Sequence, residues 1–286
     1  MYLAHFGFQL APFSQTPNTE LFLALPPHYE ALQTVLGALA MGEGMIKLTG
    51  EVGTGKTMLC RMLIAQLEQP SNDLSDTTLV YLPNPVLTGA QLQRAVAREL
   101  ALNSDDDVSV VSDIQDELIR LRQQGRKTVL LVDEAQALSD EALETLRLLG
   151  NLETEQEKLL QMVLIGQPEL DMRLQAHHLR QLRQRISFMA TLRPLNRAET
   201  ELYIEKRISQ AGAVRPLLSL AQKRAIWRAS QGIPRLINQL CHKALILAWH
   251  QGQGKISNYH LWTAMQETYD VAKPRFYTPR LWSWSR

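Results

Sequence analysis

The stretch of sequence that decides the fold is GEVGTGKT, residues Gly50 to Thr57. It fills every fixed position of the pattern G-x-x-x-x-G-K-[ST], with an apolar run before it (Met45–Leu48) and a helical pattern after it (Met58–Leu67). Glycines allow the backbone to curl until successive N–H groups face one phosphate group, and the positive end of the following helix points to the same place. The sequence therefore predicts a phosphate-binding loop, and a chance match in a glycine-rich turn is the weaker alternative.

Two side chains of this loop have distinct predicted roles. Lys56 supplies a mobile positive charge to the β- and γ-phosphates of a nucleotide, and the Thr57 hydroxyl is a ligand for Mg²⁺. The expected cofactors are therefore ATP and Mg²⁺. The residues predicted to surround the nucleotide are Gly50, Glu51, Val52, Gly53, Thr54, Gly55, Lys56, Thr57 and Met58.

A pair of acids, Asp133 and Glu134, stands about 75 residues further on, directly after the apolar run Thr128–Val132. The carboxyl ends of parallel strands line the ligand crevice of an α/β sheet, so both acids are expected beside the phosphate loop. Asp133 is then placed to hold Mg²⁺ through its water shell, and Glu134 to polarise the water that attacks the γ-phosphorus. Taken alone, such a pair is more simply a charge favoured by a helix N-terminus. The loop favours the catalytic interpretation.

The first two thirds of the chain alternate between strand-like and helix-like patterns, which predicts an α/β fold with a parallel sheet covered by helices on both faces. Beyond Pro194 the strand patterns stop, and glycines separate three or four helical patterns, near 196–211, 217–230, 234–251 and 257–269. These helices predict a small all-α domain, which the family resemblance described below implies to be a lid domain. The short apolar runs predicted as strands are Met45–Leu48, Thr77–Leu82, Thr128–Val132, Leu160–Ile165 and Ile186–Leu192.

Composition and charge divide the chain into four expected segments: an N-terminal strap (1–27), an α/β nucleotide-binding domain (28–192), the helical lid (193–270) and a basic aromatic tail (271–286). Residues 1–192 carry 15 basic and 24 acidic side chains, whereas residues 193–270 carry 11 and 5 and the tail carries four basic ones. Such a change of sign marks a domain boundary or a partner surface, or simply a basic solvated helical face.

The chain has 286 residues and two distant cysteines, Cys60 and Cys241. This arrangement argues against a disulfide framework or a zinc site and suits a reducing compartment. No Lys or Arg precedes Lys47, so no secretory signal is expected, and no apolar run is long enough to span a bilayer. We therefore expect a cytoplasmic protein.

Three roles stay open for the basic aromatic tail. It could dock to a protein or membrane, bind single-stranded nucleic acid, or be an unstructured terminus.

Four stretches carry a family resemblance: YLAHFGF (2–8) with Pro12-Phe13 and Thr16-Pro17, then GEVGTGKT, LLVDEAQ (130–136) and LIGQPEL (164–170). Together they resemble the AAA+ branch of the P-loop ATPases, and within it the ExeA/MshM type of type II secretion and type IV pilus assembly. The likeness covers residues 1–270. It implies ATP hydrolysis in a homo-oligomer, expected as a ring such as a hexamer, with an inner-membrane assembly protein as partner and a peripheral position at the inner membrane.

The resemblance also implies further site residues. Gln167 falls where such ATPases place a polar residue that orients the attacking water. Arg183 and Arg185 lie where the family keeps an arginine finger for a neighbouring subunit, with a surface ion pair as the alternative and no sequence basis for choosing between them. Arg235, in Gly232-Ile233-Pro234-Arg235, resembles the lid arginine that touches the γ-phosphate, with a surface arginine as the alternative.

Three functions are compatible with these patterns. The first is an ATP-hydrolysing factor that assembles a pilus or secretion apparatus. The second is an ATP-dependent DNA-binding regulator of the transposition or replication-initiator kind, supported by the basic helical segment and weakened by the acidic first part. The third, a scaffold that binds ATP without cleaving it, is disfavoured because Asp133 and Glu134 are both in place.

Overall fold

A computed structural model describes residues 2–14, 23–69, 76–83, 87–102, 109–154, 157–213 and 215–274. The chain divides into two compact units. We call them the sheet unit (His28–Glu51 and Lys56–Leu192) and the helical unit (Met1–Pro27, Val52–Gly55 and Arg193–Arg286). Thr16-Pro17 and residues 275–286 of the predicted tail lie outside the described residues. The four-segment division of the chain stays a prediction.

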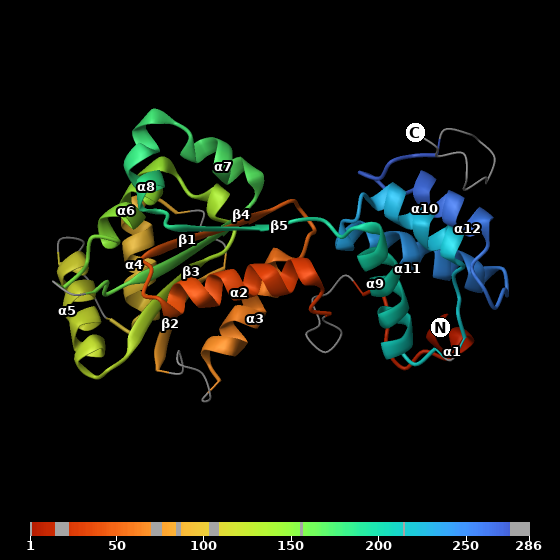
Figure 1. Cartoon of the computed structure of the whole chain (residues 1–286), viewed down its shortest axis with the longest axis horizontal. Coiled ribbons are helices and arrows are strands. Elements are labelled where there is room, and N and C mark those ends of the chain that lie inside the picture. The colour runs from red at the N-terminus through yellow and green to blue at the C-terminus, as the bar shows by residue number, and fades with distance from the viewer. Residues whose placement is uncertain are drawn as a thin grey trace. The chain divides into compact units, whose positions relative to one another are not determined.

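The sheet unit contains five parallel strands (Figure 1). Their order across the sheet is β2-β3-β4-β1-β5, so β4 lies between β1 and β3. Every residue of β1 and β4 is buried, because neighbouring strands cover their edges and helices cover both faces. The strands are β1 (Met45–Gly50), β2 (Thr77–Leu82), β3 (Lys127–Val132), β4 (Gln161–Gly166) and β5 (Phe188–Leu192).

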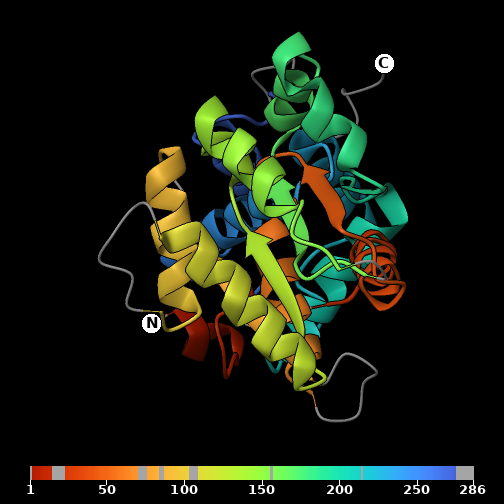
Figure 2. The same cartoon turned by 90° about the vertical axis from the view of Figure 1, so that its left-hand side faces the viewer.

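Helices cover both faces of this sheet. Side chains such as Ile46, Leu131 and Val163 form one core with α2 (Pro26–Ala40) and α3 (Lys56–Leu67). Their neighbours along the same strands point the other way and form a second core with α4 to α8. Figure 2 shows α4 and α5 in yellow and α2 in orange-red, on opposite sides of the strands. The second set is α4 (Gly89–Glu99), α5 (Val110–Gln123), α6 (Asp140–Leu149), α7 (Pro168–Leu174) and α8 (Arg180–Arg185).

The helical unit has its own apolar core. It is built from α1 (Tyr2–Phe6), α9 (Arg197–Gln210), α10 (Leu220–Ser230), α11 (Pro234–His250) and α12 (Asn258–Gln266). The last four lie within a few residues of their predicted bounds. The predicted α/β fold with a helical C-terminal part is confirmed.

The first residues of the chain belong to the core of the helical unit. Phe8 and Phe13 are buried there among side chains of the C-terminal helices. Gln9 N donates to Ala211 O at 2.7 Å, and Arg207 Nε donates to Pro12 O at 2.6 Å. Phe8 and Phe13 thus anchor the first part of the predicted strap to these helices, and Tyr2–Phe6 forms a short helix. Across the described residues, no helix combines the length and the apolar character that crossing a bilayer requires.

Candidate nucleotide-binding site

The phosphate loop joins the end of β1 to the start of α3. Its backbone passes through positive φ angles at Gly53 (+84°) and Gly55 (+108°), which residues with a Cβ rarely adopt. The loop closes around Lys56, whose Nζ donates to Gly50 O at 2.7 Å and to Glu51 O at 3.0 Å. The loop carbonyls thus hold the ammonium group at the point where the sequence predicts a phosphate.

Lys56 is buried, with 5% of its surface exposed. Burial lowers the pKa of its ammonium group, because removal from water disfavours the charged form. The carboxylates of Glu134 and Asp133 act in the opposite direction, followed by Glu51 and Glu169. The positive charge of Lys56 therefore interacts with the negative charges of the predicted acid pair. This is expected for a site that brings a cation, a metal and a nucleophile together.

The acid pair stands at the carboxyl end of β3, where Glu134 N donates to Asp133 Oδ1 at 2.9 Å. Asp133 is 2% exposed, and burial raises the pKa of its carboxyl group. The neighbouring Glu134 charge raises it further, whereas hydrogen bonds from Glu134 N–H and the Thr57 hydroxyl and the charge of Lys56 lower it. The hydrogen bond places the two predicted magnesium ligands, Thr57 and Asp133, side by side. A hydroxyl and a carboxylate are the oxygen donors that Mg²⁺ takes from a protein, so these residues fit the ion.

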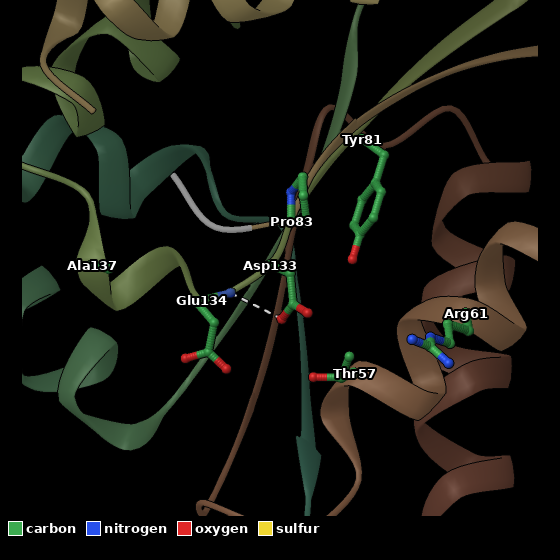
Figure 3. A pocket seen from close by; sticks show the side chains of 7 residues that line it. All are labelled: Thr57, Arg61, Tyr81, Pro83, Asp133, Glu134 and Ala137. Carbon is green, nitrogen blue, oxygen red and sulfur yellow. Dashed lines mark hydrogen bonds between the residues drawn. The ribbon is translucent and has the colours of Figure 1, made fainter. Parts of the chain in front are cut away.

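A cavity of about 650 Å³ lies beside Thr57 and Asp133 (Figure 3). Figure 3 shows Thr57 and Arg61 on α3 on one side, Glu134 on the other, and the Tyr81 hydroxyl pointing into the space between them. No periodicity or motif singles out Arg61 or Tyr81, so sequence reasoning misses both. The lining residues are Thr57, Arg61, Tyr81, Pro83, Asp133, Glu134 and Ala137.

Gln167 is hydrogen-bonded directly to Glu134, the candidate base. It follows β4 and is the N-cap residue of α7, and its Nε2 donates to Glu134 Oε2 at 3.0 Å. Because β4 lies between β1 and β3, the end of this strand falls between the phosphate loop and the acid pair. A second amide, Gln136, which sequence reasoning also misses as a site residue, donates through Nε2 to the same oxygen. Its only sequence signal is its place in LLVDEAQ, two residues after Glu134.

The two finger candidates lie on α8 and are tied to the ends of other helices. Arg183 Nη1 donates to Leu174 O at 3.1 Å, and Arg185 Nη1 donates to Gly150 O at 3.0 Å. Arg183 is exposed and Arg185 is half-buried. Both side chains sit on carbonyl groups at helix C-termini, and the choice between them as finger stays open.

Arg235 is the second residue of α11, in the helical unit. Its backbone N–H donates to Gly53 O at 3.1 Å, and both residues are grouped in that unit. A Cβ on Gly53 would lie 2.7 Å from Arg235 Cβ, so the absence of a side chain at position 53 permits this approach. The Arg235 side chain is exposed.

Comparison with known proteins defines the class. Residues 39–174 match a family model described as an AAA domain. The chain is 43% identical over 259 residues to general secretion pathway protein A of Aeromonas hydrophila, an alignment that takes in 90% of this chain and 46% of that protein. The chain thus spans about half the length of this curated relative. The fold is the predicted AAA+ P-loop fold, and the predicted resemblance to the ExeA/MshM type is confirmed.

Solved structures agree on the fold. The Aeropyrum pernix ORC2 protein, determined as ADPNP-ADP complexes, has a TM-score of 0.65 at 16% identity, covering 91% of this chain and 72% of that one. The Aeropyrum pernix ORC1 protein in complex with DNA has a TM-score of 0.63 at 19% identity, covering 86% and 66%. At these identities the likeness supports the architecture alone.

Proposed function

We propose that this chain binds ATP with Mg²⁺ and hydrolyses it to ADP and phosphate. The observation that carries the proposal is the grouping of four side chains beyond the carboxyl ends of β1 and β3. Thr57, Asp133 and Glu134 line one cavity, and the charge of Lys56 interacts with both acids. Each of these groups supplies a different part of phosphoryl transfer: a cation for the phosphates, two oxygen ligands for the metal and a carboxylate for the water. Stability of the fold alone does not require these four side chains to lie together.

Each residue has a defined part in the proposed reaction. The amides of Gly50–Thr57 and Met58 surround the phosphates, and Lys56 Nζ exchanges the carbonyl oxygens of Gly50 and Glu51 for the β- and γ-phosphate oxygens. Thr57 and Asp133 hold Mg²⁺, which when bound neutralises charge on those oxygens. Glu134 accepts the proton of the attacking water, and Gln167 helps to orient that water.

Assembly of several copies completes the site in this proposal. Arg183 or Arg185 of a neighbouring copy supplies an arginine finger, worth about 10³–10⁵ in rate, and Arg235 contacts the γ-phosphate within one chain. A homo-oligomeric ring is therefore the active form, and hydrolysis moves the helical lid to do work. The exposure of Arg183 and Arg235 supports their availability to a ligand or a second copy.

The work proposed for this ATPase is the assembly of a type II secretion apparatus or an MSHA-like type IV pilus. Support comes from the 43% identity to general secretion pathway protein A. The partner would be an inner-membrane assembly protein, with this chain on the cytoplasmic side and peripheral to the membrane. The second candidate is an ATP-dependent DNA-binding regulator, favoured by the 11 basic against 5 acidic side chains of residues 193–270 and by the fold shared with an ORC1 protein in complex with DNA.

One set of measurements tests the proposal. The ATPase rate is followed against protein concentration, with and without double-stranded DNA, for the native chain, Lys56→Ala and Glu134→Gln. We expect turnover that rises with concentration, loss of nucleotide binding in calorimetry for Lys56→Ala, and retained binding with lost turnover for Glu134→Gln. Unchanged affinity in Lys56→Ala would refute the phosphate site. Turnover that rises only on addition of DNA, and falls steeply with salt, would favour the second candidate.

A further inference from the structure

The carboxylate of Glu134 is held by two amide side chains that come from different parts of the chain. Gln136 Nε2 and Gln167 Nε2 both donate to Glu134 Oε2, the latter at 3.0 Å. At its other end the Gln136 amide accepts a hydrogen bond from Gln167 N at 3.0 Å through Oε1. The three residues thus form a closed set of contacts, in which Gln167 takes part through both its side chain and its backbone N–H. Both amides bind Oε2, and neither of them binds Oε1.

The backbone at Glu134 requires external support. Its φ and ψ angles are 54° and 38°, in the left-handed region that a residue with a Cβ adopts only when its surroundings impose it. The chain then makes one short 3₁₀ turn, Ala135–Ala137, before Ser139 caps α6. A turn of three residues has little stability of its own. Contacts from outside the segment must therefore fix the direction of the Gln136 side chain.

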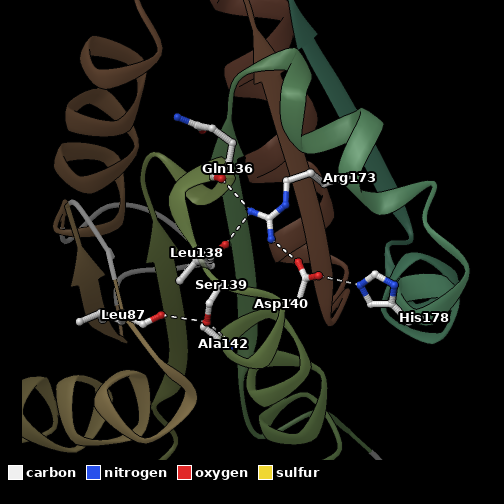
Figure 4. Close-up of polar contacts among 8 residues, drawn as sticks. All are labelled: Leu87, Gln136, Leu138, Ser139, Asp140, Ala142, Arg173 and His178. Atoms are coloured by element: carbon white, nitrogen blue, oxygen red, sulfur yellow. Dashed lines mark hydrogen bonds and ion pairs between the residues drawn. The ribbon is translucent and has the colours of Figure 1, made fainter.

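Arg173, on α7, supplies those contacts (Figure 4). Its Nη1 donates to Gln136 O at 2.8 Å and to Leu138 O at 2.6 Å. Its Nη2 forms an ion pair with Asp140, whose other oxygen lies 2.8 Å from His178 Nε2. A planar guanidinium group can bind two carbonyl oxygens and a carboxylate at fixed angles, which a lysine ammonium group cannot reproduce.

We propose that Gln136 and Arg173 are positioning residues for Glu134: Arg173 fixes the turn after β3, and this turn holds the Gln136 amide against the carboxylate. The inference rests on the proposed role of Glu134 as the base. Neither residue needs to touch the nucleotide, so both act on the rate of the chemical step and leave nucleotide affinity unchanged. A surface ion pair between Arg173 and Asp140 that had no positioning role would leave the rate of the chemical step unchanged.

The test compares Gln136→Leu, Arg173→Met and Arg173→Lys with the native chain. Turnover is measured with Mg·ATP, ADP affinity by calorimetry, and the thermal midpoint by circular dichroism. We expect kcat to fall roughly 10- to 100-fold in Gln136→Leu and Arg173→Met, with ADP affinity within about threefold of native. Arg173→Lys keeps the charge but loses the geometry, so it is expected to recover only a small part of the rate.

The matched control is Arg147→Met on α6. Arg147 is also a partly buried arginine paired with a carboxylate, with its Nε 2.8 Å from Glu144 Oε1, but its hydrogen bonds run to that side chain. We expect its kcat to equal that of the native chain. An equal loss of rate in Arg147→Met and Arg173→Met would overturn the inference, because a general loss of stability would then explain both.

A double-mutant cycle separates a positioning role from an independent one. In the Glu134→Gln background, Gln136→Leu is expected to cause no further loss of the residual rate, because the group it positions is already gone. An additional loss as large as in the native background would contradict the inference. If Gln136→Leu keeps native turnover while Glu134→Gln is inactive, the positioning inference is overturned and the assignment of Glu134 as base stands. If Glu134→Gln itself keeps native turnover, both the base assignment and the positioning inference are overturned.

Discussion

The substitution Gly232→Ala tests how the chain enters the helical unit. Gly232 is buried with φ of +76°, and a Cβ on it would lie 1.9 Å from Leu195 O and 2.9 Å from Leu195 C. The same carbonyl oxygen accepts a hydrogen bond from Trp227 Nε1 at 3.3 Å, and Leu195 N donates to Gly232 O at 2.9 Å. Because the obstacle is backbone, no side-chain rotation can make room for the methyl group.

The expected cost follows from these contacts. A residue with a Cβ pays about 1–2 kcal/mol in the left-handed region. Moving Leu195 away by the required distance breaks its two hydrogen bonds, each worth about 0.5–1.5 kcal/mol. The free energy of unfolding should therefore fall by about 2–5 kcal/mol. The matched control is Gly252→Ala in the same unit: its φ is +65°, but nothing lies within 4 Å of the added Cβ. Gly252→Ala should therefore lose only the stability that the left-handed backbone costs a residue with a Cβ, about 1–2 kcal/mol.

Tryptophan fluorescence during urea unfolding reads this unit selectively, since all five tryptophans lie at or beyond Trp227. With a slope of about 2 kcal/mol per molar urea, Gly232→Ala should lower the midpoint by about 1–2.5 M, and Gly252→Ala by about 0.5–1 M. Equal shifts in the two variants would refute the reasoning, because the clash with Leu195 would then contribute nothing.

Two further predictions concern the buried residues. Phe13→Ala should cost the helical unit about 3–5 kcal/mol, because Phe13 is fully buried; the same fluorescence assay checks this, and the control Leu10→Ala, at an exposed position, should change stability by less than about 0.5 kcal/mol. Asp133→Asn should raise the stability of the nucleotide-free protein at pH 8. Burial raises the pKa of the Asp133 carboxyl above 3.8, so the ionised group costs stability above that raised pKa. The gain should shrink as the pH falls through it, and a gain independent of pH would contradict this cause.

Much of the candidate site is local in the sequence. The loop residues Gly50–Thr57 are consecutive, so their backbone geometry follows from glycine content, an apolar strand before them and a helix after them. The position of Asp133-Glu134 at a strand end follows in the same way from the apolar run before the pair. The strands could be predicted within a few residues because each is a short apolar run bounded by polar, Gly or Pro residues, a pattern that favours a buried strand. The charge difference between residues 1–192 and 193–270 follows from composition alone.

Contacts between distant parts of the chain could not be predicted in this way. Periodicity does not state which strand pairs with which, so only the folded sheet places β4 between β1 and β3 and brings Gln167 to Glu134. The same holds for Arg173 on the turn after β3, for Tyr81 in the cavity and for Phe13 in the core of the helical unit. The physical reason is that a segment's pattern reports how much of it must be buried, whereas its partners are selected by the packing of the whole chain.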